Sequence, residues 1–407
     1  MTDRDRKGDT AIVMAGGGAR GAYEAGVVAG LMEVLGRRSR TRPPFTIFTG
    51  SSVGAINAAW LAAHADRSDL AVEGLLAHWR GLNLARHLRL DPLRLLSGRR
   101  FGTAFARFRG EKAEVIGASL LNPTGIEELV ETAIPYERLH ANVDSGLVRA
   151  LVIAALEIAT GRTALFMELA PGQAFRASMD PRRLARPTRI ESRHVLASSA
   201  LPLLFPARRI GGGYYCDGGL RTNTPIAPAI RAGARRLVIV SPTTSELPAP
   251  VEGSPEAEAA EAAYPNPIFV IGKILNTLLL DPLSYDLAVL ERLNQLMGTL
   301  QDTLEPHELE EVERVMAETR GMPYRKLETL VFKPEEDIAR IAQQYARRVQ
   351  SGTLSNVIVT RLANLGVNLQ ADLLSFVLFD REYAQHLIDL GRRDVLVRQE
   401  EVDAFFA

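Results

Sequence analysis

The chain has 407 residues, of which 46% are apolar and 24% are charged, and its formal net charge is zero. This composition is that of an ordinary globular protein, long enough for one large α/β domain with an additional segment. A neutral chain creates no overall field that would attract nucleic acid, and the single cysteine, Cys216, excludes an internal disulfide framework. We expect Cys216 to be a small buried apolar residue.

The N-terminal residues 1–9 are polar and contain no apolar h-region, so they do not predict a secretory signal. The most apolar later run, residues 267–280, is too short to span a bilayer and is interrupted by Lys273 and Asn276. We therefore expect a cytoplasmic protein, with peripheral membrane contact as the alternative to a freely soluble one.

A glycine-rich loop follows the first predicted strand, residues 9–15. Gly16, Gly18 and Gly21 satisfy the pattern G-x-G-x-x-G, so one interpretation is a dinucleotide site. That site needs an acidic residue about twenty positions further on, whereas the second predicted strand, residues 45–49, runs into glycine and serine. We favour the alternative that N–H groups of the loop, at the start of the predicted helix over 22–31, bind an oxyanion.

A second glycine-rich turn, residues 50–54, has the sequence Gly-Ser-Ser-Val-Gly. It follows the strand and precedes a helical pattern over residues 55–63. A serine at such a turn is a nucleophile elbow, in which Ser52 exposes its hydroxyl while Gly50 and Gly54 let strand and helix approach closely. A glycine and serine loop without a function is the alternative, and the strand and helix on either side favour the elbow.

Residues 80–109 form a basic and apolar segment. From Arg80 to Arg109 there are eight arginines, interleaved with leucine and phenylalanine, and Asp91 is the one acidic residue. One interpretation is a surface that docks on anionic lipid headgroups. The other is a helical layer whose arginines extend into solvent. We expect no nucleic-acid binding, because no recognised motif accompanies the segment.

Asp217, Gly218 and Gly219 form a turn ahead of a predicted strand over residues 237–241. An aspartate in a glycine turn is most often only a turn residue, because its side chain accepts hydrogen bonds from nearby backbone N–H groups. The need of Ser52 for a base favours a second role for Asp217.

The histidines decide between a triad and a dyad. In an α/β-hydrolase the triad histidine follows the acid, and only His307 and His386 do so here. His307 lies in a charged run and His386 in an amphipathic segment, so neither is expected beside the sheet. His194 precedes Asp217 in a helical pattern, and we expect it to pack in the core or on the surface. The economical arrangement is a dyad of serine and aspartate.

The C-terminal part divides into a linker and a helical region. Residues 246–266 are rich in proline, alanine and glutamate and predict an exposed linker. Beyond it, residues 267–407 contain four stretches with apolar residues at three- and four-residue spacing: 283–296, 338–346, 373–379 and 383–390. These helices would complete the core, or would form a lid or the surface of a homodimer.

The glycine loop, the serine elbow, residues 197–206 and the turn at Asp217 occur in the order found in patatin-like phospholipases, and the chain resembles this family over about residues 8–245. The resemblance implies an α/β fold, a three-layer α/β/α sandwich with a mostly parallel central sheet. The apolar spacing beyond residue 266 adds a helical C-terminal extension, and the charge pattern adds a basic helical insertion at about residues 66–150 of the catalytic domain.

The resemblance also implies site residues. Ser52 would be the nucleophile and Asp217 the base, while Arg20 would stabilise the loop or the developing charge. Gly16, Gly17 and Gly18 would donate to the oxyanion, and the remaining motif glycines are Gly21, Gly50, Gly54, Gly218 and Gly219. No metal or cofactor is implied. The expected function is a lipid acyl hydrolase that cleaves carboxylic esters of phospholipids or other acyl lipids through an acyl-enzyme. The alternative is a catalytically silent lipid-binding or regulatory protein on the same scaffold.

Overall fold

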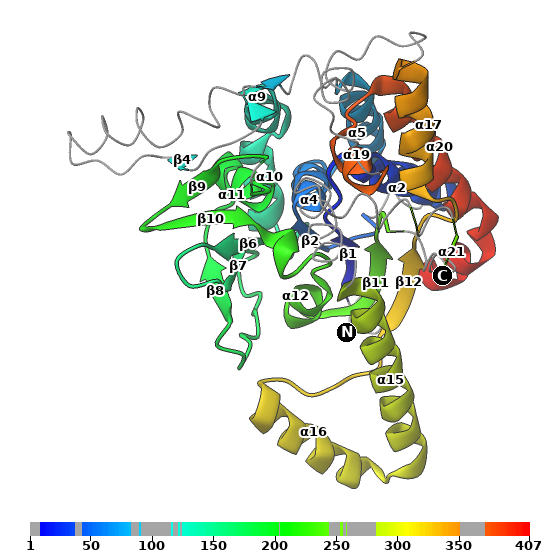
Figure 1. Cartoon of the computed structure of the whole chain (residues 1–407). Helices are drawn as coiled ribbons and strands as arrows, with labels where there is room; N and C mark the ends of the chain where they lie inside the picture. Colours follow the sequence, from blue (N-terminus) through cyan, green and yellow to red (C-terminus); the bar gives the residue numbers. More distant parts are fainter. Residues whose placement is uncertain are drawn as a thin grey trace.

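One large sheet organises the chain in the computed structural model (Figure 1). The structure describes residues 9–36, 43–82, 89–90, 115–116, 121–122, 124–202, 204–243, 253–254, 258, 282–350 and 371–407. Most of the predicted linker and most of the basic segment therefore lie outside the described residues, including Arg109. Within the described residues, no helix is both long enough and apolar enough to cross a membrane.

The centre of the sheet is parallel, as predicted. Its strands run in the order β12-β11-β1-β2-β6. Their bounds are Glu328–Phe332 for β12, Ala234–Val240 for β11, Asp9–Met14 for β1, Ile47–Ser51 for β2 and Ala150–Glu157 for β6. The carboxyl ends of β1 and β2 lie at one edge, since Met14 pairs with Gly50. Loops at such an edge are where α/β sheets place their sites.

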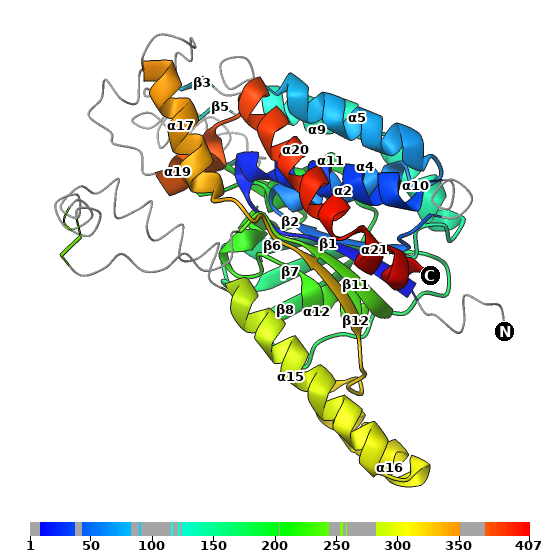
Figure 2. The same cartoon turned by 90° about the vertical axis from the view of Figure 1, so that its right-hand side faces the viewer.

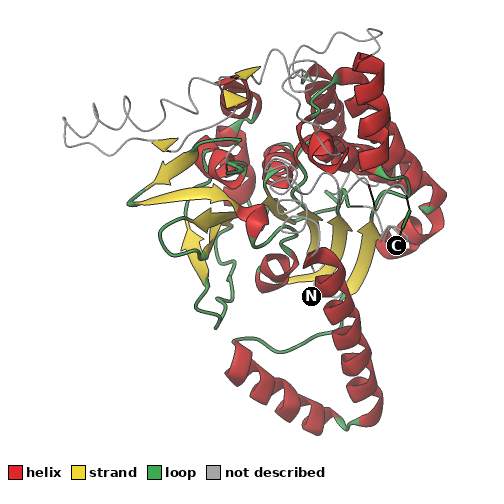
Figure 3. Cartoon of the chain, viewed as in Figure 1, coloured by secondary structure: helices red, strands yellow, loops and turns green. Residues whose placement is uncertain are grey.

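Beyond β6 the sheet becomes mainly antiparallel (Figure 3). The strands β10, β9 and β4 follow β6 in one direction, while β7 pairs with β6 and β8 pairs with β7. Their bounds are Gly213–Asp217 for β10, Ala207–Ile210 for β9, Val115–Ile116 for β4, Thr163–Leu169 for β7 and Arg183–Pro187 for β8. A separate two-stranded sheet joins β3 (Arg89–Leu90) to β5 (Leu121–Asn122).

Helices cover both faces of the sheet, because its strands are apolar on both sides. In β1, Ile12 and Met14 belong to the larger core cluster, whereas Ala11 and Val13 belong to a second cluster on the other face. Figure 2 shows the resulting three layers. The larger cluster packs under α2 (Gly21–Leu35), α4 (Val53–Ala63), α5 (Ser68–Gly81) and α20 (Arg381–Val397), and the second under α12 (Ile226–Arg231) and α15 (Pro282–Thr303).

The described C-terminal residues are part of the same core. The strand β12 extends the sheet beside β11, and α20 packs along α2, where the Tyr23 hydroxyl donates to Asp394 Oδ2 at 3.0 Å. The predicted helices are present as α15, α17 (Ile338–Gln350), α19 (Ala371–Val377) and α20. Two further helices, α16 (Pro306–Arg320) and α21 (Gln399–Phe406), complete this part, and α16 projects away from the sheet (Figure 1).

Three more helices lie beside the β6 to β9 half of the sheet (Figure 1). They are α9 (Thr124–Ala133), α10 (Tyr136–Asp144) and α11 (Ser192–Ser198). All three contribute side chains to the larger core cluster. Two of them, α9 and α11, also form walls of the candidate site.

Candidate active site

Ser52 occupies a strained turn between β2 and α4. Its φ is 53° and its ψ is −128°, and it is the one non-glycine residue with a positive φ in the described part of the chain. A Cβ at Gly50 would collide with the carbonyl oxygen of Gly54, so the strand and helix can approach only with glycine there. Strain of this kind is typical of a nucleophile elbow.

The end of α11 supports the strained turn. The Ser52 N–H donates to Ser198 Oγ at 2.9 Å, and the Ser198 hydroxyl donates to the Ala154 carbonyl at 2.6 Å. The neighbouring Ser199 Oγ donates to the Ser52 carbonyl at 3.2 Å. These two serines belong to the segment that contributed to the family resemblance, but sequence reasoning assigned them no role. The only local signal was a pair of small polar residues at a helix end.

Asp217 lies at the end of β10 and reaches the serine. Its Oδ2 accepts a hydrogen bond from Ser52 Oγ at 2.6 Å, and its Oδ1 accepts one from the Gly219 N–H at 2.7 Å. The residue is 1% exposed. Burial raises the pKa of Asp217 to about 7, although the two hydrogen bonds act in the opposite direction. Gly218 is required beside it, because a Cβ there would collide with the Ala154 carbonyl.

His194 has a structural role. It lies in the first turn of α11, where its Nδ1 accepts a hydrogen bond from the Glu191 N–H at 3.0 Å and forms part of a capping box. Its ring packs against Phe166, with 4.9 Å between ring centres, and burial lowers its pKa to about 4. Of the two placements expected for His194, in the core or on the surface, the structure has the core. His307 lies on α16 and His386 on α20.

The glycine loop predicted from the sequence covers residues 16–21. Gly17 and Gly18 line the same cavity as Ser52, and their N–H groups take part in no hydrogen bond within the described residues. Gly16 differs, because its N–H donates to the Asn223 carbonyl at 3.0 Å. The Gly16 N–H is therefore already engaged in this structure, unlike those of Gly17 and Gly18. It joins the loop to the segment that follows Asp217.

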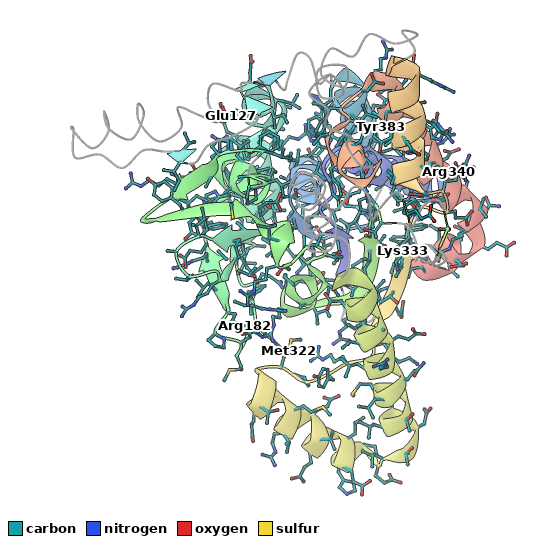
Figure 4. The ribbon with its side chains drawn as sticks, in the orientation of Figure 1. Glu127, Arg182, Met322, Lys333, Arg340 and Tyr383 are labelled. Atoms are coloured by element: carbon teal, nitrogen blue, oxygen red, sulfur yellow. The ribbon has the colours of Figure 1, made fainter. Side chains whose placement is uncertain are left out.

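Arg20 connects the glycine loop to α19. It is 3% exposed, its Nε donates to Ser375 Oγ at 2.8 Å, and its guanidinium lies 4.3 Å from the ring centre of Phe376. Tyr383, labelled in Figure 4, donates to the Ser375 carbonyl at 3.4 Å. Of the two roles expected for Arg20, these contacts correspond to stabilising the loop. Gly21 follows, with Trp79 so close that a Cβ would lie 2.7 Å from its ring.

Ser52 and Asp217 open into an apolar cavity. Its walls come from α4, α5, α9, α11, α19 and the segment between α11 and β9. The apolar lining residues include Ile56, Trp60, Leu75, Trp79, Leu129, Ile134, Leu201, Phe205, Phe376 and Phe379. A cavity of this composition suits an acyl chain better than a polar ligand.

A buried polar chain lies under one wall of the cavity. Trp79 Nε1 donates to Asn57 Oδ1 at 3.0 Å, and Asn57 Nδ2 donates to Glu24 Oε2 at 2.7 Å. Glu24 is completely buried, and burial raises its pKa well above the usual range. These residues connect α2, α4 and α5 behind the elbow, and sequence reasoning did not single them out.

The profile of the patatin-like phospholipase family matches residues 12–230, which is more than half of the chain. The chain belongs to the patatin-like phospholipase family. The matched range contains the turn at Ser52, the glycine loop and Asp217, and the predicted membership and fold class are confirmed. Membership in this family supports a lipid hydrolase activity.

Other comparisons add little to the family match. No curated protein sequence matches the chain. Among solved structures, VipD from Legionella pneumophila has 12% identity and a TM-score of 0.29, covering 96% of this chain and 88% of its own. The complex of ExoU and SpcU from the type III secretion system of Pseudomonas aeruginosa has 16% identity and a TM-score of 0.25. This match covers 91% of this chain and 74% of the chain in that structure.

Proposed function

We propose that this patatin-like protein is a serine lipid acyl hydrolase that cleaves carboxylic esters of phospholipids or other acyl lipids. One observation carries the proposal: the hydroxyl of the strained Ser52 donates to the buried Asp217 at 2.6 Å, at the wall of an apolar cavity. A nucleophile held by its base is the arrangement that acyl transfer requires.

In the proposed acylation step, Asp217 takes the proton of Ser52 Oγ as this oxygen attacks the ester carbonyl carbon. The carbonyl oxygen becomes negative and accepts hydrogen bonds from the N–H groups of Gly17 and Gly18. The start of α4 directly after Ser52 adds the positive end of a helix dipole. The leaving alcohol then takes the proton from Asp217, and the acyl group remains on the serine.

In the proposed deacylation step, a water molecule gives its proton to Asp217 and attacks the acyl-enzyme. The same loop donors stabilise the second oxyanion, after which Ser52 leaves and regains its proton from Asp217. The free fatty acid departs through the apolar cavity. One aspartate thus acts as base and then as acid in each half of the cycle.

The environment of Asp217 supports its role as base. An ordinary carboxyl group, with a pKa of about 3.9, is a weak base for a serine hydroxyl. Burial of Asp217 raises its pKa to about 7. A base with a pKa near the working pH combines a large ionised fraction with a strong drive to accept the proton.

Hydrolysis of dihexanoylphosphatidylcholine by purified variants tests the proposal. Ser52→Ala and Asp217→Asn should each abolish release of hexanoic acid, and the double variant should lose no more, because the two residues act as a unit. Ser51→Ala is a matched control, since the neighbouring hydroxyl is buried without a hydrogen-bond partner among the described residues. Hydrolysis retained in Ser52→Ala would contradict the mechanism. A wild-type protein that binds lipid without hydrolysis would favour the silent scaffold.

We also propose peripheral membrane contact through residues 80–109. The support comes from the sequence, with eight arginines among leucines and phenylalanines. Of these arginines, Arg80 and Arg89 belong to described elements, and Arg80 Nε donates to Gln385 of α20 at 2.6 Å. Binding to vesicles of phosphatidylglycerol should weaken as salt rises, and equal binding after Arg99, Arg100, Arg107 and Arg109 are replaced by glutamine would contradict the proposal.

A further inference from the structure

Arg208 brings a positive charge to the wall of the mainly apolar cavity. It lies on β9 and lines the cavity together with Ser52 and Asp217. Among the described residues of the lining it is the one arginine, and they include no lysine. Its side chain is 14% exposed, so the guanidinium is largely removed from bulk water.

The hydrogen bonds of Arg208 are incomplete. Its Nη2 pairs with Glu127 Oε1 of α9, which lies beside the β9 end of the sheet (Figure 4). Its Nε is buried and has no hydrogen-bond partner within the described structure. A guanidinium presents its donors in a fixed planar fork, so the Nε N–H can donate to an anionic oxygen while Nη2 keeps donating to the Glu127 carboxylate.

We propose that Arg208 binds the phosphate group of a glycerophospholipid substrate and thereby selects phospholipids over neutral acylglycerols. This inference rests on the proposed hydrolase function and names the substrate class of the same site. The phosphodiester is the group of a phospholipid that a guanidinium recognises, whereas a diacylglycerol offers only ester and hydroxyl groups.

The surroundings of Arg208 make this selection effective. The cavity walls are apolar, so a charge-assisted hydrogen bond there is stronger than one in water. Asp217, on the same lining, repels an anion when ionised, so a phosphate needs a cation on its own side of the cavity. Among the described residues of the lining, Arg208 is the side chain that supplies this positive charge.

Glu127 opposes the binding of a phosphate. Its carboxylate neutralises Arg208 in the free protein, and its side chain is 25% exposed. Removing the Glu127 charge should therefore strengthen phosphate recognition, whereas removing the Arg208 charge should weaken it. A purely structural ion pair between β9 and α9 would respond in the same direction to both changes.

The experiment measures kcat/KM for two matched soluble substrates, dihexanoylphosphatidylcholine and dihexanoylglycerol, and takes their ratio. Arg208→Gln should lower the ratio of the phospholipid value to the diacylglycerol value about 10- to 100-fold, which is the usual contribution of a hydrogen bond to a charged group. Glu127→Gln should raise the ratio. Arg209→Gln is the matched control, because successive residues of a strand point to opposite faces and Arg209 is not among the described lining residues.

Three outcomes would overturn the inference: an unchanged ratio in Arg208→Gln, a shift in the same direction in Glu127→Gln, or an equal shift in Arg209→Gln. Inorganic phosphate separates a headgroup site from a site for the free anion. If phosphate inhibits dihexanoylglycerol hydrolysis in wild type but not in Arg208→Gln, while the ratio does not change, the site takes free phosphate and the headgroup assignment is wrong. Loss of both activities in Ser52→Ala tests the hydrolase function separately.

Discussion

Asp217 should make the hydrolysis rate depend on pH near neutrality. The base is active only when ionised, and the pKa of Asp217 is about 7. Below that pH, kcat/KM for a neutral ester should therefore fall about tenfold for each pH unit, so that about 1% of the maximum remains at pH 5. The assay is hydrolysis of dihexanoylglycerol from pH 5 to pH 9, with the released acid measured by chromatography.

The same carboxyl group should make stability depend on pH. In the folded chain Asp217 holds its proton up to about pH 7, whereas in the unfolded chain it loses the proton near pH 3.9. Between these values the folded state binds more protons, so the free energy of unfolding falls as pH rises. Asp217→Asn does not lose stability in this way, so its free energy of unfolding relative to wild type should increase by about 3 kcal/mol between pH 5 and pH 8.

Denaturant unfolding of both proteins at the two pH values measures this difference. The comparison with Asp217→Asn cancels the effects of other buried acids such as Glu24, whose pKa burial also raises. The reasoning would be refuted by a flat rate profile from pH 5 to pH 8 together with a stability difference that does not change with pH.

Three further substitutions test the supports of the site. Ser198→Ala removes the acceptor of the elbow N–H, and it should lower turnover and reduce the free energy of unfolding by about 1–3 kcal/mol in urea. Ser375→Ala removes the acceptor of Arg20 Nε and should lower kcat more than it raises KM in steady-state kinetics, because the loop donors act in the transition state. Gly54→Ala places a Cβ against the carbonyl of Met14, and circular dichroism should show loss of the native fold.

Three strands of the parallel centre could be predicted because each has a recognisable pattern in its own sequence. The runs that became β1, β2 and β11 are apolar and are followed by glycine or proline-rich turns. The strand β12 was not predicted, since residues 328–332 are short and bounded by polar residues. Its Leu330 and Phe332 are buried in the fold, where the strand pairs with β11. Its place depends on the rest of the sheet and not on its own pattern.

The candidate site likewise contains residues that the sequence identified and residues whose role depends on distant contacts. Ser52 and Asp217 could be paired from chemistry, because a serine needs a base and suitable histidines are absent from the sequence. The hydrogen bond of the Gly16 N–H could not be predicted, because its partner Asn223 is about 207 residues away and no local pattern reveals it. Ser198 and Arg208 were missed for the same reason: their importance lies in contacts across the fold, with the elbow and with Glu127.

Labelling with a fluorophosphonate tests whether Ser52 is a nucleophile activated by Asp217. Peptide mass spectrometry should find one adduct, on Ser52, and the labelling rate should rise with pH through about 7, following the pKa of Asp217. Asp217→Asn should label far more slowly at every pH. Labelling of another serine such as Ser199, or an unchanged rate in Asp217→Asn, would contradict the dyad.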